Sequence, residues 1–406
     1  MTGETTVPLA GLDVDGVENV YIFVADTLRW DALPRRVADL GCTFRAAANG
    51  LNTPQSLPAI VSGRYPPSHG VTWFHHQMAP DLETFFDIEG TTAGYVDTEW
   101  DRPLKDVLRH PPEATVAGAD PPFVVLEHDR GGHAPYPAMS DAMPSEIYTE
   151  LSRDPDALRR HYEEGVAASV DRFEQRLATL EERGLLDETL VVFTSDHGEL
   201  LGEYGGFVGH SRPCAPELVY VPMTVIHPSV AQERHTDVLV QLVDLLPTVR
   251  DVLDRPLDRD EHAYDGQSLL REVGLGRPSY THGTVHAPER WRDTRLDPVY
   301  EAPSVWTCDG GHVFNETSIP RRVLMSLYDG LLSGYTAAYN TDRPRPFTLG
   351  STLSTYLPGS RTFGEPDIPR EHAREFVDEV NAGDVRRHEI ELSEETKETL
   401  ENLGYV

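Results

Sequence analysis

Three uninterrupted apolar runs constrain the fold of this chain more than any other feature of its sequence. They are NVYIFVA at residues 19–25, PFVVL at residues 122–126 and TLVVFT at residues 189–194. Runs of β-branched and aromatic residues without polar alternation are typical of parallel strands that are buried on both faces. Helices must cover both faces of such a sheet, so the sequence predicts an α/β fold with a mostly parallel central sheet.

Chemically reactive side chains follow each of these runs. Asp26 comes directly after the first, the loop from Glu127 to His133 follows the second, and Ser195-Asp196-His197 follows the third. The carboxyl ends of parallel strands meet at one edge of a sheet, where ligands bind. Carboxylates and imidazoles there indicate a metal or anion site. Two alternatives stay open: Asp26 could cap the next turn, and the loop residues Asp129 and His133 could be solvated.

The segment from Asn49 to Val71, NGLNTPQSLPAIVSGRYPPSHGV, has the pattern of a catalytic elbow. Thr53 precedes Pro54 and a short apolar run that can begin a helix, and a turn at residues 63–66 follows. The N-terminus of a helix directs backbone N–H groups toward an anion, and a hydroxyl there can act as a nucleophile. The alternative is that Thr53 only caps the helix.

Residues 156–183 repeat apolar side chains with a 3.6-residue period, which predicts a long amphipathic helix ended by Gly184. Residues 236–253 predict another helix with a kink or boundary at Pro247, and Pro222 interrupts a strand-like stretch.

The composition changes after about Gly276. Short strands are expected around residues 279–283 and 304–308, followed by a Pro- and Gly-rich loop zone at residues 342–369. A terminal helix should begin after Ser393 and end at Gly404. The sequence therefore predicts a catalytic α/β domain at residues 1–276 and a smaller C-terminal subdomain at residues 277–406.

The chain is strongly acidic, with a formal net charge of −32, and only Lys105 and Lys397 among its 35 basic residues are lysines. An acidic, lysine-poor surface stays hydrated where high salt screens the repulsion between like charges, so we expect a halophilic protein. The same balance argues against nucleic acid as a partner, because no basic face could neutralise phosphates.

Three cysteines, Cys42, Cys214 and Cys308, are too few and too scattered for a disulfide framework. The first residues have neither a basic nor an apolar export region, and no apolar run is long enough to span a bilayer. We therefore expect a protein of the reducing cytoplasm without a membrane span.

The order of Asp26, Thr53 and Asp196-His197 resembles that of the sulfatase branch of the alkaline phosphatase superfamily. VYIFVADTLRWD resembles the family's first strand and metal acid, TPQSLPAIVSGRYPPSHGV its nucleophile elbow, and HAPY its loop histidine. TLVVFTSDHGELLGE, the most specific segment, resembles its Asp-His metal pair, and VQLVDLLPTV with DGQSLL resembles the close of its large domain. The resemblance covers residues 19–270. It implies an alkaline-phosphatase-like three-layer sandwich with a smaller C-terminal subdomain.

The elbow departs from the pattern of true sulfatases, in which a Cys or Ser inside a Cys-x-Pro-x-Arg signature is oxidised to formylglycine. Thr53 stands at the nucleophile position, Gln55 at that of the Pro and Leu57 at that of the Arg. A threonine cannot become formylglycine, because its methyl group would give a ketone. Thr27 also replaces the second acid of the usual pair, and no Lys-x-His follows. Relatives with an unmodified Thr include phosphodiesterases, nucleotide pyrophosphatases and phosphoglycerol transferases.

The resemblance implies a metal-dependent hydrolase or transferase that acts on phosphate or sulfate esters of small molecules, glycans or lipids. The ion would be bound by Asp26, Thr53, Asp196 and His197. This donor set favours Zn²⁺ or Mn²⁺ and is less suited to Ca²⁺, which prefers oxygen ligands.

Three further residues would complete the catalytic site. His133 and His210 could bind a second ion together with Asp129, or could hydrogen-bond the ester. Arg212 could clamp its oxygens with a guanidinium fork. The alternative function is that of a fold relative which has lost turnover and only binds an anionic ligand or a partner protein.

Overall fold

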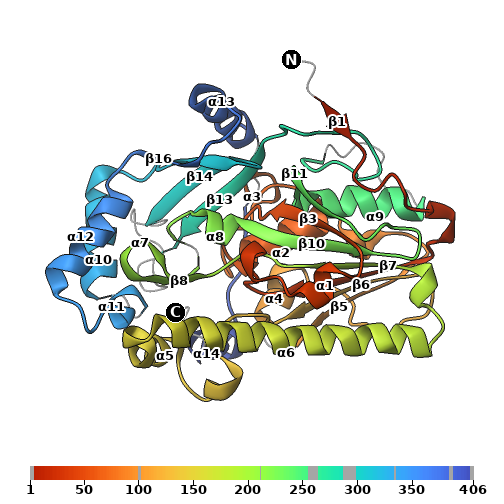
Figure 1. The fold of residues 1–406 in the computed structure, drawn as a ribbon, viewed down its shortest axis with the longest axis horizontal. Coiled ribbons are helices and arrows are strands. Elements are labelled where there is room, and N and C mark those ends of the chain that lie inside the picture. The colour runs from red at the N-terminus through yellow and green to blue at the C-terminus, as the bar shows by residue number, and fades with distance from the viewer. Residues whose placement is uncertain are drawn as a thin grey trace.

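A seven-stranded sheet forms the centre of the protein (Figure 1), with the strand order β11-β3-β10-β7-β2-β6-β5. The computed structural model describes residues 4–98, 102–210, 212–254, 264–286, 299–332, 335–383 and 387–402. The sheet strands are β2 (Asn19–Ala25), β3 (Cys42–Ala47), β5 (Thr92–Asp97), β6 (Phe123–Asp129), β7 (Thr189–Thr194), β10 (Tyr220–Ile226) and β11 (Arg234–Gln241). All run parallel except β10, which pairs antiparallel with both β3 and β7. The prediction of a mostly parallel sheet is confirmed.

Helices cover both faces of this sheet. Val20, Ile22 and Val24 of β2 lie in a core with α2 (Thr53–Ser62), α4 (Arg102–Val107) and α9 (Leu245–Leu253). Tyr21 and Phe23 point to the other face, where α6 (Pro155–Glu182) packs along the sheet (Figure 1). Because successive side chains of a strand alternate between faces, β2 contributes to both cores. The result is a three-layer α/β sandwich.

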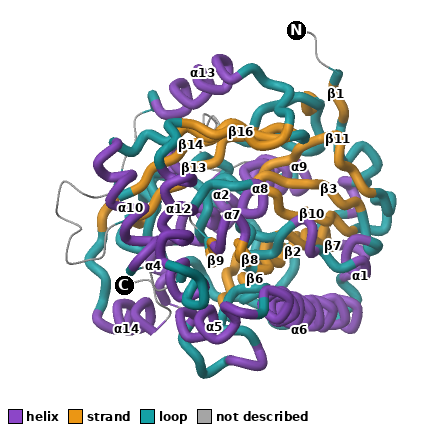
Figure 2. Tube along the Cα trace, turned by 60° about the vertical axis from the view of Figure 1, so that its left-hand side comes forward, coloured by secondary structure: helices purple, strands orange, loops and turns teal. Residues whose placement is uncertain are grey.

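A four-stranded antiparallel sheet lies beside the large one. Its strands are β13 (Ser279–Val285), β14 (Tyr300–Thr307), β15 (Gly310–Phe314) and β16 (Ser360–Gly364). Around it are α10 (Ile319–Leu331), α11 (Thr336–Tyr339), α12 (Arg345–Tyr356) and α13 (Arg370–Asn381). Figure 2 shows α10 near the edge with α12 beside it, both apart from α6. A domain boundary at residue 276 stays a prediction, since the two sheets are joined by hydrogen bonds from Asn49 described below.

Short elements connect these layers. The helices are α1 (Arg35–Ala38), α3 (Pro66–His69), α5 (Pro144–Glu150), α7 (Glu203–Gly206), α8 (Pro216–Val219) and α14 (Glu394–Asn402). Paired short strands are β1 (Thr5–Thr6) with β12 (Val273–Gly274), β4 (His76–Gln77) with β17 (His388–Glu389), and β8 (Leu200–Gly202) with β9 (Phe207–Gly209). Within the described ranges, no helix is both long and apolar enough to cross a bilayer.

Three sequence predictions about local structure are wrong. Residues 236–241 belong to strand β11, because the run Val238–Val240 is buried in the sheet core, and a helix begins only after it. Pro222 lies inside β10 without interrupting it. The expected loop zone at residues 342–369 contains α12 and β16.

The predicted terminal helix is confirmed, and the Ser393 hydroxyl accepts a hydrogen bond from the backbone of Thr396 at its start. Its expected end at Gly404 lies outside the described residues.

Candidate functional site

Parallel strand ends bring Asp26, Asp196 and His197 together. Val24 of β2 pairs in register with Thr194 of β7, so the residues two positions further along the chain leave the sheet side by side. One ligand atom from each of the three side chains lies within 4.8 Å of the others, and all three side chains are fully buried. His197 Nε2 is 3.2 Å from Asp196 Oδ2 and 3.7 Å from Asp26 Oδ1. The sequence-predicted ligand set is therefore spatially compact.

Backbone contacts fix the orientation of this cluster. The His197 Nδ1 atom lies 3.0 Å from the Gly198 carbonyl oxygen, to which it donates, so the lone pair of Nε2 faces the two carboxylates. The backbone N–H groups of Thr27 and His197 both donate to Asp196 Oδ1. Thr27 adopts a φ of 60°, which is unusual for a β-branched residue. Such strain is maintained only where the surroundings impose it.

The elbow places Thr53 beside these groups. The side chain of Asn52, one residue earlier, caps α2 by accepting a hydrogen bond from the Gln55 backbone N–H. The Thr53 hydroxyl is therefore not needed as the cap, and its Oγ1 lies 3.4 Å from His197 Nε2. It is at the N-terminus of α2, whose dipole favours negative charge.

Within the described residues, no arginine or lysine forms an ion pair with this cluster. Neither Asp26 oxygen nor Asp196 Oδ2 has a hydrogen-bond partner among the described residues. Burial, together with the neighbouring charge of Asp196, raises the pKa of Asp26 well above its usual range. Burial lowers the pKa of His197, which keeps its imidazole neutral. Two unpaired buried carboxylates beside a neutral imidazole and a hydroxyl have the donor chemistry that a divalent cation requires.

His133 and His210 lie next to this cluster. Their Nε2 atoms are 3.2 Å apart, and the ring of His210 stacks on that of His197 with centroids 4.5 Å apart. Burial lowers the pKa of His133 to about 3 and that of His210 well below its usual value. Both imidazoles are thus neutral near pH 7.

Arg212 and Asp129 are held by other partners. The guanidinium of Arg212 binds the buried carboxylate of Asp329 in α10, at 3.0 and 3.2 Å. Asp129 accepts two hydrogen bonds from Arg172 of α6. Service as an anion clamp or as a ligand of a second ion would require these ion pairs to break.

Comparison with known proteins identifies the family. A family model described as Sulfatase matches residues 72–254. The chain is 34% identical to the low-salt glycan biosynthesis sulfotransferase Agl7 of Haloferax volcanii, over 99% of this chain and 100% of Agl7. The chain belongs to the sulfatase family. It is also 30% identical to the multifunctional alkaline phosphatase superfamily protein PehA of Trinickia caryophylli, over 44% of this chain and 40% of PehA.

Solved structures show that the sulfatase-family fold is retained at low identity. The phosphonate monoester hydrolase of Agrobacterium radiobacter aligns with a TM-score of 0.57 and 16% identity, over 73% of this chain and 87% of its own. The 2-O GAG sulfatase BT1596 aligns with a TM-score of 0.57 and 14% identity, over 90% of both chains.

Two residues of this sulfatase-family site escaped the sequence analysis. His128 is fully buried, its Nδ1 lies 3.2 Å from Asp97 Oδ2, and its Nε2 lies 3.8 Å from Asp26 Oδ2. The register pairs Asp97 with His128 across β5 and β6. The available signal was that His128, like Asp26, ends an apolar run, but it was treated as part of the loop.

Glu199, two residues after His197 in a Gly-rich stretch, would be a solvated loop acid by its sequence context, but the structure shows otherwise. Its side chain is 1% exposed, and Tyr148 of helix α5 donates a hydrogen bond to it at 3.1 Å. Burial raises the pKa of Glu199 to about 8.

Proposed function

We propose that this protein is a metal-dependent hydrolase or transferase of phosphate or sulfate esters, with Thr53 as the nucleophile. The observation that supports the proposal best is that the Thr53 hydroxyl converges with three buried ligand groups that are not paired with an arginine or lysine. A divalent ion, Zn²⁺ or Mn²⁺ rather than Ca²⁺, would lower the pKa of the hydroxyl and polarise the ester oxygens. Asp26, Asp196 and His197 would hold it, with the Thr53 oxygen as a further ligand.

The chain's own residues would carry the reaction in two steps. Thr53 Oγ1 attacks the phosphorus or sulfur atom, the bond to the leaving oxygen breaks, and that oxygen takes up a proton. Water or an acceptor alcohol then attacks the threonine ester, which regenerates the hydroxyl. His133 and His210, neutral and adjacent, would contact the ester, with His133 Nε2 as an acceptor because its Nδ1 donates to the Ala134 carbonyl, and Arg212 would support them from its ion pair with Asp329.

Position 53 favours phosphate esters in this scheme. A formylglycine hydrate can expel sulfate by collapsing to the aldehyde, whereas a threonine ester has no such route. We therefore expect a p-nitrophenyl phosphate or phosphodiester to turn over faster than the matching sulfate. Sulfuryl transfer to a glycan is the second candidate, favoured by the sulfotransferase name of Agl7. The acidic, arginine-rich composition supports assays at high salt and a location in a halophile's cytoplasm.

One plate tests the proposal with aryl sulfate, phosphate and phosphodiester in Zn²⁺ or Mn²⁺, for wild type, Thr53→Ala and the control Thr248→Ala. Thr248 is a buried hydroxyl of α9 that bonds only backbone atoms. Thr53→Ala should lower turnover at least about 10³-fold, and Thr248→Ala should not. Activity that survives Thr53→Ala would show that Thr53 is not the nucleophile. If the purified protein contains no metal, binds no added ion and cleaves none of the three substrates, the result would favour the alternative of an inactive binding protein.

A further inference from the structure

Helix α10 presents its apolar side chains to the outside. Exposed positions form one stripe along α10, made of Ile319, Val323, Leu324, Leu327, Tyr328 and Leu331, and Phe347 of the neighbouring helix α12 is exposed as well. Among the described residues, Met143 is the sole exposed large apolar side chain that lies outside residues 319–357. We call this stripe with Phe347 the α10 face. A contiguous apolar patch on an otherwise acidic surface marks an interaction site.

The inner side of α10 packs through small and polar residues together with Met325, which lies in the core beneath the helix. Thr352 of α12 donates a hydrogen bond to the Ser326 carbonyl at 2.8 Å, and a Cβ added to Gly330 would lie 2.9 Å from the Thr352 hydroxyl. Asp329 binds Arg212. Apolar side chains of α10 thus lie mainly outside and polar ones mainly inside, the reverse of a helix that packs on a core in water. Helix pairs in lipid pack in this way, with small and hydroxyl residues between them and apolar residues outward.

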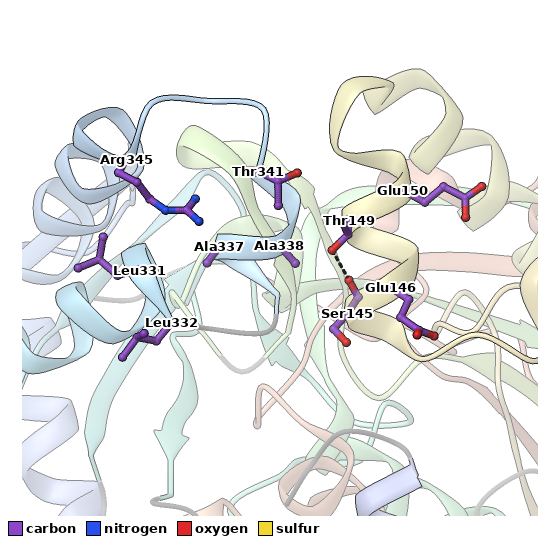
Figure 3. A pocket seen from close by; sticks show the side chains of 10 residues that line it. All are labelled: Ser145, Glu146, Thr149, Glu150, Leu331, Leu332, Ala337, Ala338, Thr341 and Arg345. Atoms are coloured by element: carbon purple, nitrogen blue, oxygen red, sulfur yellow. Dashed lines mark hydrogen bonds between the residues drawn. The ribbon is translucent and has the colours of Figure 1, made fainter.

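The charge around the α10 face also differs from that of the whole chain. Residues 317–361 contain five arginines and two aspartates, of which Asp329 is buried, whereas the chain carries −32. The guanidinium of Arg343 lies over the Phe347 ring, 4.8 Å from its centroid. Arg345 extends from α12 into a pocket at the margin of the face, which Leu331 and Leu332 line on one side and Glu146 and Glu150 of α5 on the other (Figure 3). A second copy placed symmetrically on this face would bring arginine against arginine, so an anionic partner fits better.

We propose that the α10 face docks this protein onto the surface of an anionic lipid bilayer. The leucines and Phe347 would enter the interface, and Arg343 and Arg345 would meet phosphate headgroups. The helix has 13 residues, too few to span a bilayer, so it would lie in the plane of the interface. In molar salt the repulsion between the acidic body and the bilayer is screened beyond about 3 Å, while the burial of apolar surface is not weakened.

Vesicle co-sedimentation of the full chain in molar KCl tests this proposal, with vesicles of phosphatidylglycerol or of phosphatidylcholine. The test variant is Leu324→Gln with Leu327→Gln, and its matched control is Leu324→Met with Leu327→Met, which keeps the apolar surface. Wild type and the Met variant should sediment with phosphatidylglycerol vesicles, and the Gln variant should bind at least about tenfold more weakly. The double variant Arg343→Gln with Arg345→Gln should remove the preference for phosphatidylglycerol. The control double variant Arg35→Gln with Arg160→Gln, at exposed arginines elsewhere, should keep that preference.

Three outcomes would overturn the proposal. The first is wild-type protein that stays in solution with both vesicles, and the second is a Gln variant that binds as well as wild type while its circular dichroism is unchanged. The third is a dimer in light scattering that the Gln variant dissociates, with no sedimentation of wild type. That last result would assign the face to a second copy of the chain.

Discussion

At neighbouring strand ends of the central sheet, buried acids are paired with arginine in one place and not in the other. At the end of β6, Glu127 and Asp129 are buried, and each is paired with an arginine from α6, Arg176 and Arg172. At the ends of β2 and β7, Asp26 and Asp196 are equally buried, and no arginine of the described residues pairs with them. Their nearest cationic group is His128, whose Nε2 lies 3.8 Å from Asp26 Oδ2 and whose pKa is raised because the charge of Asp97 outweighs burial.

The two pairs of acids therefore differ in electrostatics. Burial alone would raise the pKa of Asp129, but the hydrogen bonds and charge of Arg172 lower it below its usual value. Burial and the charge of Asp196 raise the pKa of Asp26. The contrast shows that burial of a strand-end acid does not by itself indicate a metal ligand. A buried strand-end acid that faces no arginine does indicate one.

The largest effect that tests this contrast concerns metal affinity. Asp196→Asn should weaken the binding of Zn²⁺ or Mn²⁺ about 100-fold or more, because it removes a charged ligand rather than an outer partner. Asp129→Asn and Glu199→Gln should leave affinity within about threefold, and Thr53→Ala should retain most of it. Calorimetric titration of the ion-free protein measures these values. Equal losses for Asp196→Asn and Asp129→Asn would remove the distinction between the two strand ends.

The next effect is on folding stability and has opposite signs in the two regions. Asp129→Asn leaves Arg172, itself 33% exposed, without its partner, and should lower the free energy of unfolding by about 1–3 kcal/mol. In ion-free protein, Asp196→Asn relieves repulsion of Asp26 and should raise it by about 1 kcal/mol. Denaturant unfolding with and without chelator gives both numbers.

An effect of comparable size is expected in the pH dependence of stability. Because the folded pKa of Glu199, about 8, is above its ordinary value of 4.5, folding stability that Glu199 supports at low pH should be lost as the pH rises between these values. Glu199→Gln should remove this loss and be about 1–3 kcal/mol more stable than wild type above pH 8. Asp129, with a lowered pKa, should act in the opposite direction and lose its contribution as the pH falls below about 4. Thermal melts of both variants across about pH 2–9 test the two slopes, and parallel slopes would contradict the assignment.

The smallest effect concerns backbone strain at the two ends. The turn after β6 uses Gly131 for its positive φ, whereas the turn after β2 uses Thr27. Thr27→Gly should therefore raise stability by about 0.5 kcal/mol, since relief of strain exceeds the added chain entropy. Thr194→Gly, in the regular strand β7, should lower it by about 0.5–1 kcal/mol. A loss of stability in Thr27→Gly would show that its side chain contributes more than the strain removes.

The sequence predicts the sheet and the cluster because both depend on local patterns. An apolar run followed by Asp26 or by Asp196-His197 contains the strand and the ligand together, and parallel register makes them converge. The ion pairs of Arg212 with Asp329 and of Asp129 with Arg172 join residues 117 and 43 positions apart, and no local pattern reports them. Strand β11 was assigned to a helix for the same reason, because its pairing with β3 decides its conformation.

The hydrogen bonds of Asn49, just before the elbow, can form only late in the synthesis of the chain. Its side chain donates to the Tyr280 carbonyl at 2.8 Å, its carbonyl accepts from the His282 N–H at 3.0 Å, and its side-chain oxygen accepts from Val243. The bond from Val243 requires a residue 194 positions later, and the bond to Tyr280 requires one 231 positions later, so the loop that carries Thr53 gains these partners only after most of the chain has left the ribosome. Contacts of such separation form late, because loop closure must precede them. A nascent or truncated chain that ends before β13 would contain Asp26, Asp196 and His197 but lack these bonds beside the loop that carries Thr53.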